Sequence, residues 1–316
     1  MNKFIFRFAA CIPVVLVCCL LLSGRTIAEP KVGIIIPELR APYNEIYNSI
    51  GDGVDESLQQ KSKRLFLEKG YDSEIVTDWL DNQGIEAVIT LGSLGQSSIK
   101  YLPDNLSVVL GAVLSSSSDT SLYPSVALLP DPAEQFRLLK ELDNSRKRVV
   151  VVYNPSKNQW LIDLAKQQAG ANNLQLVAYK ANNIKQAAMI YDEVLTNGQL
   201  DSTALWLLQD RTVVDSKVVL PFILEKTWQK SIVVFSGSPG HVKHGVLFCM
   251  FPNNEAHGKQ AASLLLKEAR GYPVDNGIYP TEGLQKAINS RTAEHLGLNI
   301  SKSEMREFDL VFPLSN

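Results

Sequence analysis

Short apolar segments alternate with amphipathic helical segments through most of this chain, and no other feature constrains its fold as much. Residues 87–91 (AVITL) and 203–208 (TALWLL) are almost wholly apolar, as are strands that a parallel sheet buries on both faces. Ile46, Ile50 and Val54 recur at the four-residue spacing of a buried helix face. Because such alternation with short connections is typical of parallel sheets, the sequence predicts an α/β fold.

The alternation of strands and helices occurs in two series. The first runs through residues 32–113 and is followed by a serine-rich stretch, residues 115–123, which we expect to be a surface loop. A helix capped by Asp131 then leads into the second series. Even without its N-terminal segment, the chain exceeds what one hydrophobic core usually holds. We therefore predict two doubly wound parallel-sheet lobes.

The N-terminal 28 residues have the pattern of an export signal. Lys3 and Arg7 precede an apolar run over residues 8–22, and Ala28 ends a stretch of small residues suited to cleavage. The run is shorter than the about 20 residues that a membrane-spanning helix needs. We expect cleavage after Ala28 and a periplasmic location. An uncleaved N-terminal anchor is the alternative.

Cysteine and charge content argue against a disulfide-stabilised fold and against nucleic-acid binding. Cys11, Cys18 and Cys19 lie in the predicted signal, which leaves Cys249 as the one cysteine of the mature chain. Cys249 stands in the apolar segment GVLFCMF, so we expect a buried thiol and not a nucleophile. The 31 basic and 33 acidic residues include no long basic run, which makes nucleic acid an unsuitable partner.

The segment GSLGQS, residues 92–97, is open to three interpretations: a phosphate loop, a bare turn or a pocket wall. Its spacing matches neither G-x-x-x-x-G-K-[ST] nor G-x-G-x-x-G. Small residues before a helix still leave backbone N–H groups free to meet an anion or carboxylate. In the second series, residues 209–212 follow an apolar strand in the same way. Because parallel sheets bind ligands outside the carboxyl ends of their strands, the two loops are predicted to face one ligand.

Two motifs that suggest catalytic or metal sites are incomplete. Residues 236–240 (SGSPG) have serine where a G-x-S-x-G nucleophile elbow needs glycine, and no acid–histidine pair follows in the expected style. His241, His244 and His257 have no cysteine or carboxylate cluster near them in sequence, so we interpret them as solvated loop histidines. The sequence predicts no enzyme, no metal site and no cofactor.

Asp210 and Arg211 are the charged residues best placed to meet a ligand. They come directly after an apolar strand, at its carboxyl end. Asp210 has the chemistry to accept hydrogen bonds from an ammonium or hydroxyl group, and Arg211 that to clamp a carboxylate. The alternatives are a surface ion pair or a helix-capping aspartate.

Five stretches of the chain form a recognisable series by their order and spacing: AVITLGSLGQSSIK, LPDPAEQFRLLKELDNSRKRVVVVYNPSKN, ALWLLQDRTVVDS, VVFSGSPGHVKHGVLFCMFPNNEAHGKQAASLLLK and KAINSRTAEHLGLNIS. Through them, and over nearly its whole length after residue 28, the chain resembles the solute-binding proteins of ABC transporters, in the tryptophan/tyrosine-type group. Many members carry Asp-Asn where this chain has Asp210-Arg211, and its first loop adds Arg40, so the resemblance does not by itself assign an amino-acid ligand.

This resemblance implies a type I periplasmic-binding fold, in which two α/β lobes joined by a three-stranded hinge close around one small molecule. The implied first lobe consists of residues 29–118 and 249–283, and the second of residues 119–248 and 284–316. The helix around Glu255–Ala269 would then return to the first lobe.

The resemblance also places ligand-binding loops at the strand ends of both lobes. In the first lobe the implied ligand-binding residues are Pro42, Tyr43, Ser93, Leu94, Gln96 and Ala112. In the second lobe they are Asn154, Gln209, Asp210, Arg211, Ser236 and Ser238.

The implied function is capture of a small metabolite, amino-acid-like or another small polar or aromatic compound, and its delivery to an ABC permease. The implied protein is a monomer without enzymatic activity, cofactor, metal or nucleic-acid partner. A periplasmic sensing module that reports its ligand to a membrane receptor kinase or cyclase is the alternative, because both roles use the same closed state.

Overall fold

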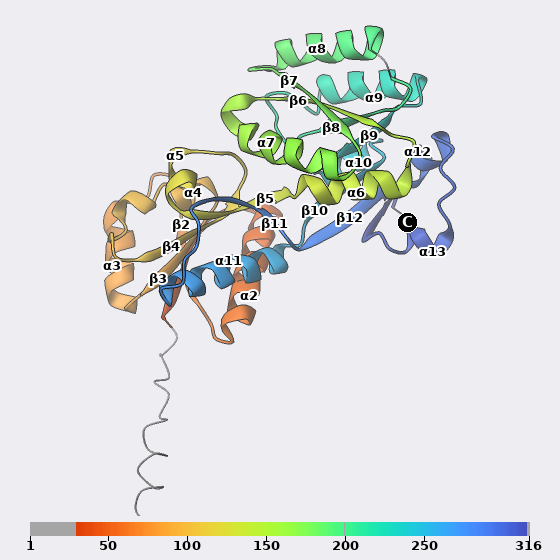
Figure 1. Cartoon of the computed structure of the whole chain (residues 1–316). Coiled ribbons are helices and arrows are strands. Elements are labelled where there is room, and N and C mark those ends of the chain that lie inside the picture. The colour runs from red at the N-terminus through yellow and green to blue at the C-terminus, as the bar shows by residue number, and fades with distance from the viewer. Residues whose placement is uncertain (1–29, 199, 315–316) are drawn as a thin grey trace, which may run out of the picture. The chain divides into compact units, whose positions relative to one another are not determined.

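The computed structural model describes residues 30–198 and 200–314, and within them the predicted alternation folds into two sheets (Figure 1). The sheets are parallel apart from one strand pair, and helices lie between successive strands in sequence except between β11 and β12. The predicted α/β class is confirmed. The predicted export segment, with its three cysteines, lies outside the described residues.

The first sheet has the strand order β11-β5-β4-β3-β1-β2, and its neighbouring strands are parallel. The central strands β1 and β3 are buried along their whole length, which explains why their sequences are almost wholly apolar. The chain adds β2 on one side of β1 and β3, β4 and β5 on the other, so the strand order reverses between β1 and β3, as in a doubly wound sheet. The strands are β1 (Val32–Pro37), β2 (Lys63–Leu67), β3 (Ala87–Leu91), β4 (Ser107–Val113), β5 (Pro124–Pro130) and β11 (Gly277–Thr281).

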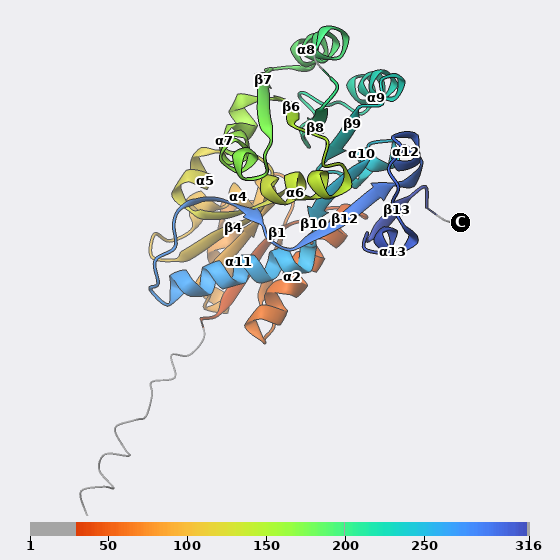
Figure 2. The same ribbon diagram turned by 45° about the vertical axis from the view of Figure 1, so that its right-hand side comes forward.

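Helices cover both faces of the first sheet (Figures 1 and 2). On one face, Ile50 and Val54 of α2 join Ala261 and Leu265 of α11 in a core with the sheet. On the other face, Val76 of α3 packs in a separate core. The helices are α2 (Tyr43–Leu58), α3 (Ser73–Gln83), α4 (Gly92–Gln96), α5 (Ser118–Leu122) and α11 (Asn254–Ala269), with a 3-10 turn, η1 (Ile99–Tyr101).

The second sheet repeats this plan, with the order β13-β12-β10-β9-β8-β6-β7. The chain adds β7 on one side of β6 and β8 on the other, so the strand order reverses between β6 and β8. Strands β10 and β12 form the antiparallel pair of this sheet. The strands are β6 (Arg148–Tyr153), β7 (Gln175–Lys180), β8 (Thr203–Leu207), β9 (Val233–Ser236), β10 (Phe248–Pro252), β12 (Leu284–Asn289) and β13 (Leu310–Phe312).

An aromatic row fills one side of the second sheet. The rings of Trp206, Phe235 and Phe248 stack across β8, β9 and β10, and Phe136 of α6 and Leu161 of α7 pack over them. Helices α8, α9 and α10 cover the opposite face. The helices are α6 (Pro132–Leu142), α7 (Pro155–Ala171), α8 (Ile184–Asn197), α9 (Val219–Gln229), α10 (Pro239–Lys243), α12 (Ser290–His295) and α13 (Lys302–Met305).

We expected the serine-rich stretch at residues 115–123 to be a surface loop, but part of it forms the short helix α5. Ser117 and Thr120 form a capping box that begins α5. The prediction failed because serine favours both loops and helix N-termini, and only the reciprocal hydrogen bonds distinguish the two.

Three segments connect the two sheets. The chain leaves the first sheet after Pro130, returns to it after Pro252 and leaves again at residues 282–283. The N–H of Asn253 donates to the carbonyl of Gly283 at 2.9 Å, which joins the second and third segments. We call the first sheet with α2–α5 and α11 the first lobe, and the second sheet with its remaining helices the second lobe.

Two strands lie in a different sheet from the one that the family resemblance implied. β5 follows the expected end of the first lobe at residue 118, yet it pairs with β4, with Leu110 opposite Ser125. β10 overlaps the expected return at residue 249, yet it pairs with β9 of the second sheet. Each crossing comes at the proline that ends the strand, before the residue that caps the next helix, so the chain changes sheet one strand later than expected.

Cys249 lies in β10 with no exposed surface and is a free thiol. Burial raises the pKa of this thiol above its ordinary value, so the predicted buried cysteine is confirmed. Among the described residues, no helix combines the length and apolar character that crossing a membrane requires.

Candidate functional site

The candidate site lies at the carboxyl ends of the strands beside the two reversals of strand order. In the first lobe these ends lead into residues 38–43, 92–96 and 112–116, and in the second lobe into residues 154–158, 208–212 and 236–238. Ligands of doubly wound sheets bind at this place. All twelve residues implied by the family resemblance stand in or beside these segments, and their contact with a ligand stays a prediction.

Asp210 holds the loop that follows β8. Its side chain is buried, with the residue 7% exposed. Oδ1 accepts from the N–H and the hydroxyl of Thr212 at 2.9 and 2.7 Å, and Oδ2 accepts from Nδ2 of Asn158 at 3.0 Å. Nζ of Lys157 lies 3.5 Å from Oδ1. Asp210 is therefore not an exposed ion pair. Its bond to the N–H of Thr212 resembles that of a capping aspartate, but it begins a turn and not a helix, because the next helix starts only at Val219. The side-chain bonds of Asp210 in the structure all go to the second lobe.

Asn154 ties the same loop to the end of β6. Its Nδ2 donates to Oγ1 of Thr212 at 3.1 Å, and its Oδ1 caps α7 by accepting the N–H of Ser156 at 3.1 Å. Asn158, one helical turn further along α7, is the residue that reaches Asp210. The first turn of α7 and the loop after β8 thus form one hydrogen-bonded unit.

Gln209 and Arg211 flank Asp210 and are exposed. Within the described part of the chain, neither side chain has a hydrogen-bond or ion-pair partner. Arg211 therefore keeps its guanidinium donors free, which is the chemistry of a carboxylate clamp.

Ser236 and His241 are in contact, which the sequence did not predict. Oγ of Ser236 lies 2.7 Å from Nδ1 of His241, and the N–H of Ser238 donates to the same Oγ at 3.2 Å. Burial, with a smaller effect from His244, lowers the pKa of His241 to about 4. The interpretation of His241 as a solvated histidine is wrong, because α10 folds back over the end of β9.

The serine–histidine pair does not have the arrangement of a catalytic triad. Ser236 has no exposed surface, and Nε2 of Gln135 donates to its carbonyl at 2.9 Å. No carboxylate of the described residues contacts the ring of His241, so the group that orients a catalytic histidine is missing from them. The pair instead fixes the turn that carries Ser238.

The segment GSLGQS forms helix α4, and its first residue, Gly92, packs against Tyr47 of α2. Gly92 has a φ of 64°, and a Cβ added there would lie 2.6 Å from the hydroxyl oxygen of Tyr47, so only glycine fits without a shift. Ser93 is exposed, whereas Leu94 and Gln96 are half-buried. A helix of five residues is too short to supply the dipole of a phosphate site, which leaves the pocket wall and the bare turn.

Pro42 and Tyr43 stand where the loop after β1 enters α2. Both are exposed, and Arg40 beside them is exposed as well. The peptide bond between Ala41 and Pro42 is cis. This loop presents an aromatic ring and a cation at the edge of the first lobe.

Ala112 has a left-handed backbone that a histidine holds in place. Its φ is 54°, and its N–H donates to Nε2 of His257 at 2.9 Å. His257 has no exposed surface, and burial lowers its pKa to about 4. The interpretation of His257 as a solvated loop histidine is therefore also wrong, because α11 places its ring under β4.

Ser116 of the first lobe is in contact with the second lobe. The N–H and Oγ of Ser116, after β4, lie 3.1 and 3.3 Å from the carbonyl oxygen of Lys157 in α7. The side chain of the same lysine approaches Asp210. The first turn of α7 thus touches the loops after β4 and β8.

Sequence reasoning missed Lys157, Asn158 and His257. Asn158 had a usable signal, since it stands four residues after Asn154 and so on the same helix face. His257 had none, because its partner Ala112 is 145 residues away.

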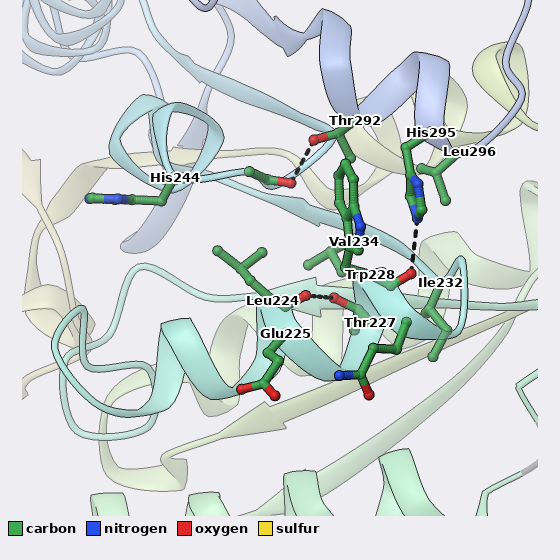
Figure 3. A pocket seen from close by; sticks show the side chains of 12 residues that line it. Leu224, Glu225, Thr227, Trp228, Ile232, Val234, His244, Thr292, His295 and Leu296 are labelled. Carbon is green, nitrogen blue, oxygen red and sulfur yellow. Dashed lines mark hydrogen bonds between the residues drawn. The ribbon is translucent and has the colours of Figure 1, made fainter.

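A cavity of about 350 Å³ lies on the second lobe between α9, α10 and α12, and none of the twelve implied residues lines it (Figure 3). The rings of Trp228 and His295 stack there with centroids 3.6 Å apart, and Nε2 of His295 donates to the carbonyl of Trp228. The hydroxyls of Thr227 and Thr292 donate to backbone carbonyls. These polar groups are thus already paired within the protein.

Metal coordination finds no support in the described residues. They contain no group of three or more histidine, cysteine, aspartate or glutamate residues that could hold a metal ion.

A family model described as ABC transporter substrate binding protein matches residues 131–307, which is more than half of the chain. No curated protein sequence matches this chain.

Solved structures share its fold over most of its length. The ABC domain in complex with L-Trp from Streptococcus pneumonia has a TM-score of 0.55 at 17% identity, and the match covers 89% of this chain and 100% of that one. The ligand-free, open structure of CD0873, a substrate binding protein with adhesive properties from Clostridium difficile, has a TM-score of 0.61 at 16% identity and covers 89% and 99%. A conserved domain protein from Vibrio cholerae gives 0.54 at 15%, covering 90% and 100%. The expected type I periplasmic-binding-like fold is confirmed.

Proposed function

This chain belongs to the ABC transporter substrate binding protein family, and we propose that it captures one small metabolite between its two lobes and delivers it to an ABC permease. Family and fold both point to a binding protein and not to an enzyme. The ligand would stabilise the closed arrangement of the lobes by the amount by which it binds that arrangement more tightly than the open one.

One observation carries the proposal: the first turn of α7 touches strand-end loops of both lobes. Ser116 of the first lobe bonds to the backbone of Lys157, and the side chain of Lys157 approaches Asp210 in the second. A ligand beside this turn would contact both lobes at once. Such bridging is what makes closure depend on the ligand.

The groups left free at these loops favour a ligand with an acidic or acceptor-rich end and a planar or apolar body. Arg211 and Gln209 have unused donors, whereas both oxygens of Asp210 already accept hydrogen bonds from within the lobe. We therefore assign direct contact to Arg211 and the holding of the loop to Asp210. The exposed ring of Tyr43 offers a stacking surface to an aromatic group.

We also propose that residues 1–28 direct export to the periplasm and are then removed, and that the mature protein is a monomer. Expression in a bacterial host, followed by N-terminal sequencing of the periplasmic product, tests the first part. A start near residue 29 is expected, and a membrane-bound product that begins at Met1 would contradict it.

A thermal-shift screen tests the central proposal. The mature chain is melted with amino acids, nucleosides, sugars and small organic acids, each at the same millimolar concentration. A compound present at a hundred times its dissociation constant adds about 2.7 kcal/mol to the free energy of unfolding, which raises the melting temperature by about 5 °C. The proposal fails if neither the panel nor a small-molecule extract of bacterial culture raises it.

Two matched variants separate the site from the rest of the surface. Arg211→Gln should remove most of the shift produced by the best panel compound. Lys166→Gln, on the exposed face of α7, should leave the shift unchanged. Equal shifts in the two variants would remove Arg211 from the site.

A further inference from the structure

Strand β4 contains a bulge at the point where it reaches the candidate site. Leu110 pairs with Ser125 and Val113 with Ala127, so that Gly111 and Ala112 stand opposite a single residue of β5. Ala112 is left-handed, a conformation that costs a non-glycine residue of order 1 kcal/mol and persists where surrounding contacts fix it. The contact that fixes it is therefore part of the site's construction.

The partner of the bulged amide is His257. Nε2 of this ring accepts the N–H of Ala112 at 2.9 Å, so a neutral ring carries its proton on Nδ1. A Cβ added at Gly111 would lie 2.6 Å from a methyl of Leu91 but at an ordinary contact distance of 3.6 Å from Nε2, so the close neighbour that requires glycine is Leu91 and not the ring. The lowered pKa of His257 keeps the ring neutral, and hence an acceptor, near pH 7.

His257 stands on a rigid support that continues into the crossing segments. It lies in the first turn of α11, where its N–H bonds to the carbonyl of Asn253, and Asn253 bonds in turn to Gly283 in the third crossing. Helix α11 packs closely against α2: at Gly258 the two backbones are so near that an added Cβ would overlap the carbonyl of Ile50.

From this geometry we infer that His257 is the positioning residue of the first lobe's ligand loop: its neutral ring holds Ala112 left-handed and so sets the course of residues 112–116. The inference rests on the proposed function for the statement that this loop meets a ligand. The course of the loop itself is a property of the ligand-free protein. His257 connects the crossing segments to the loop that carries Ser116.

Two substitutions separate hydrogen bonding from packing. His257→Gln keeps an acceptor near the position of Nε2, whereas His257→Leu keeps apolar volume and offers no acceptor. Amide hydrogen exchange is measured by NMR in the ligand-free mature protein and in both variants. The amides of Ile89 and Val76, in β3 and α3 of the same lobe, serve as internal references.

We expect the Ala112 amide and those of residues 113–116 to exchange about tenfold faster in His257→Leu, with the references unchanged within about threefold. His257→Gln should restore most of the protection. In the parent protein, a nitrogen–nitrogen coupling across the hydrogen bond should link Ala112 to His257.

Two results would overturn the inference. One is unchanged exchange at Ala112 in His257→Leu. The other is acceleration of the whole first lobe in both variants alike, which would make His257 a packing residue. Because no ligand is needed, a negative thermal-shift screen would count against the proposed function and leave this inference to be decided by the exchange data.

Discussion

In the second lobe the strand-end loops are held by a network of hydrogen-bonded side chains, whereas in the first lobe they depend on single left-handed residues, each supported by one neighbouring side chain. The side chains of Asn154 and Asn158 donate hydrogen bonds to Thr212 and Asp210 and so connect α7 to the loop after β8. Asp210 also accepts the backbone N–H of Thr212 within that loop. In the first lobe, Gly92 and Ala112 are left-handed, and a neighbouring side chain packs against or bonds to each. The two lobes share the order of five parallel strands, β5-β4-β3-β1-β2 and β10-β9-β8-β6-β7, and still hold the loops at the ends of these strands by different means.

This difference predicts different sensitivities. Deleting a side chain in the second lobe should leave buried donors without acceptors, which is costly. Adding a single methyl group in the first lobe should disturb a backbone that has no room for it.

The largest effect is expected for Asp210→Ala. This change leaves the N–H and hydroxyl of Thr212 and the amide of Asn158 without their acceptor in a buried place, so the free energy of unfolding should fall by about 3 kcal/mol. The half-exposed Lys157 adds little to this figure. Chemical denaturation measures the change.

The matched control for Asp210 is Asp163→Ala, which removes an exposed carboxylate from α7. Its free energy of unfolding should stay within about 0.5 kcal/mol of the parent. If the two variants lost equal stability, the second-lobe network would not be what holds the loop.

Acid should destabilise the protein through the fully buried His257 of the first lobe and, to a smaller extent, through the half-buried His241 of the second. The pKa of each is lowered to about 4 from an ordinary value near 6.5, so the unfolded chain binds more protons between these values. Stability is complete above about pH 6.5 and falls as the pH drops toward 4, by an amount on the order of 3 kcal/mol for the fully buried His257.

The pH effect is measured as the difference between parent and variant, because carboxylates titrate in both. The parent should lose more stability than His257→Gln between pH 7 and pH 4.5, and the difference should be smaller for His241→Gln, whose residue is partly exposed. A larger effect at His241 would reverse the expected order of the two lobes.

Gly92→Ala should lower the free energy of unfolding by about 2 kcal/mol, from the left-handed backbone and from contact with Tyr47. Gly271→Ala is the control, because Gly271 is also left-handed but has no atom within 4 Å of an added Cβ. That variant should lose about 1 kcal/mol. The difference between the stability losses of the two variants, measured by thermal melts, gives the cost of the contact with Tyr47 alone. Equal losses would mean that Tyr47 and α2 move aside without a cost in stability.

The smallest effect is expected for Asn154→Ala, at about 1.5 kcal/mol. It removes the cap of α7 together with the bond to Thr212. Asn183→Ala removes the cap of α8 and no second bond in the site, so it should cost about 1 kcal/mol. Should Asn183→Ala prove the more damaging of the two, the bond between Asn154 and Thr212 would contribute nothing.

The sequence predicted the α/β class and most strands because burial on both faces of a parallel sheet demands runs of apolar residues. It also located the strand-end loops, since a polar stretch after such a run marks the carboxyl end of a strand. It failed where a residue's role depends on a distant partner. His257 and His241 were interpreted as solvated because nothing near them in sequence shows that α11 and α10 bury them.

Asp210 shows the same limit in another form. Its place after β8 was correctly inferred, but the sequence does not show whether its oxygens face a ligand or the lobe. That depends on Asn158 and Thr212, which reach it only after α7 has packed beside the loop.

Hydrogen exchange with and without the best compound of the thermal-shift screen shows where that compound binds, and so decides whether both lobes hold the ligand. We predict slower exchange at residues 92–96 and 112–116 of the first lobe and at residues 209–212 and 236–238 of the second, all with the same concentration dependence. Protection confined to one lobe, or centred on the cavity beside Trp228, would contradict a ligand held between the two.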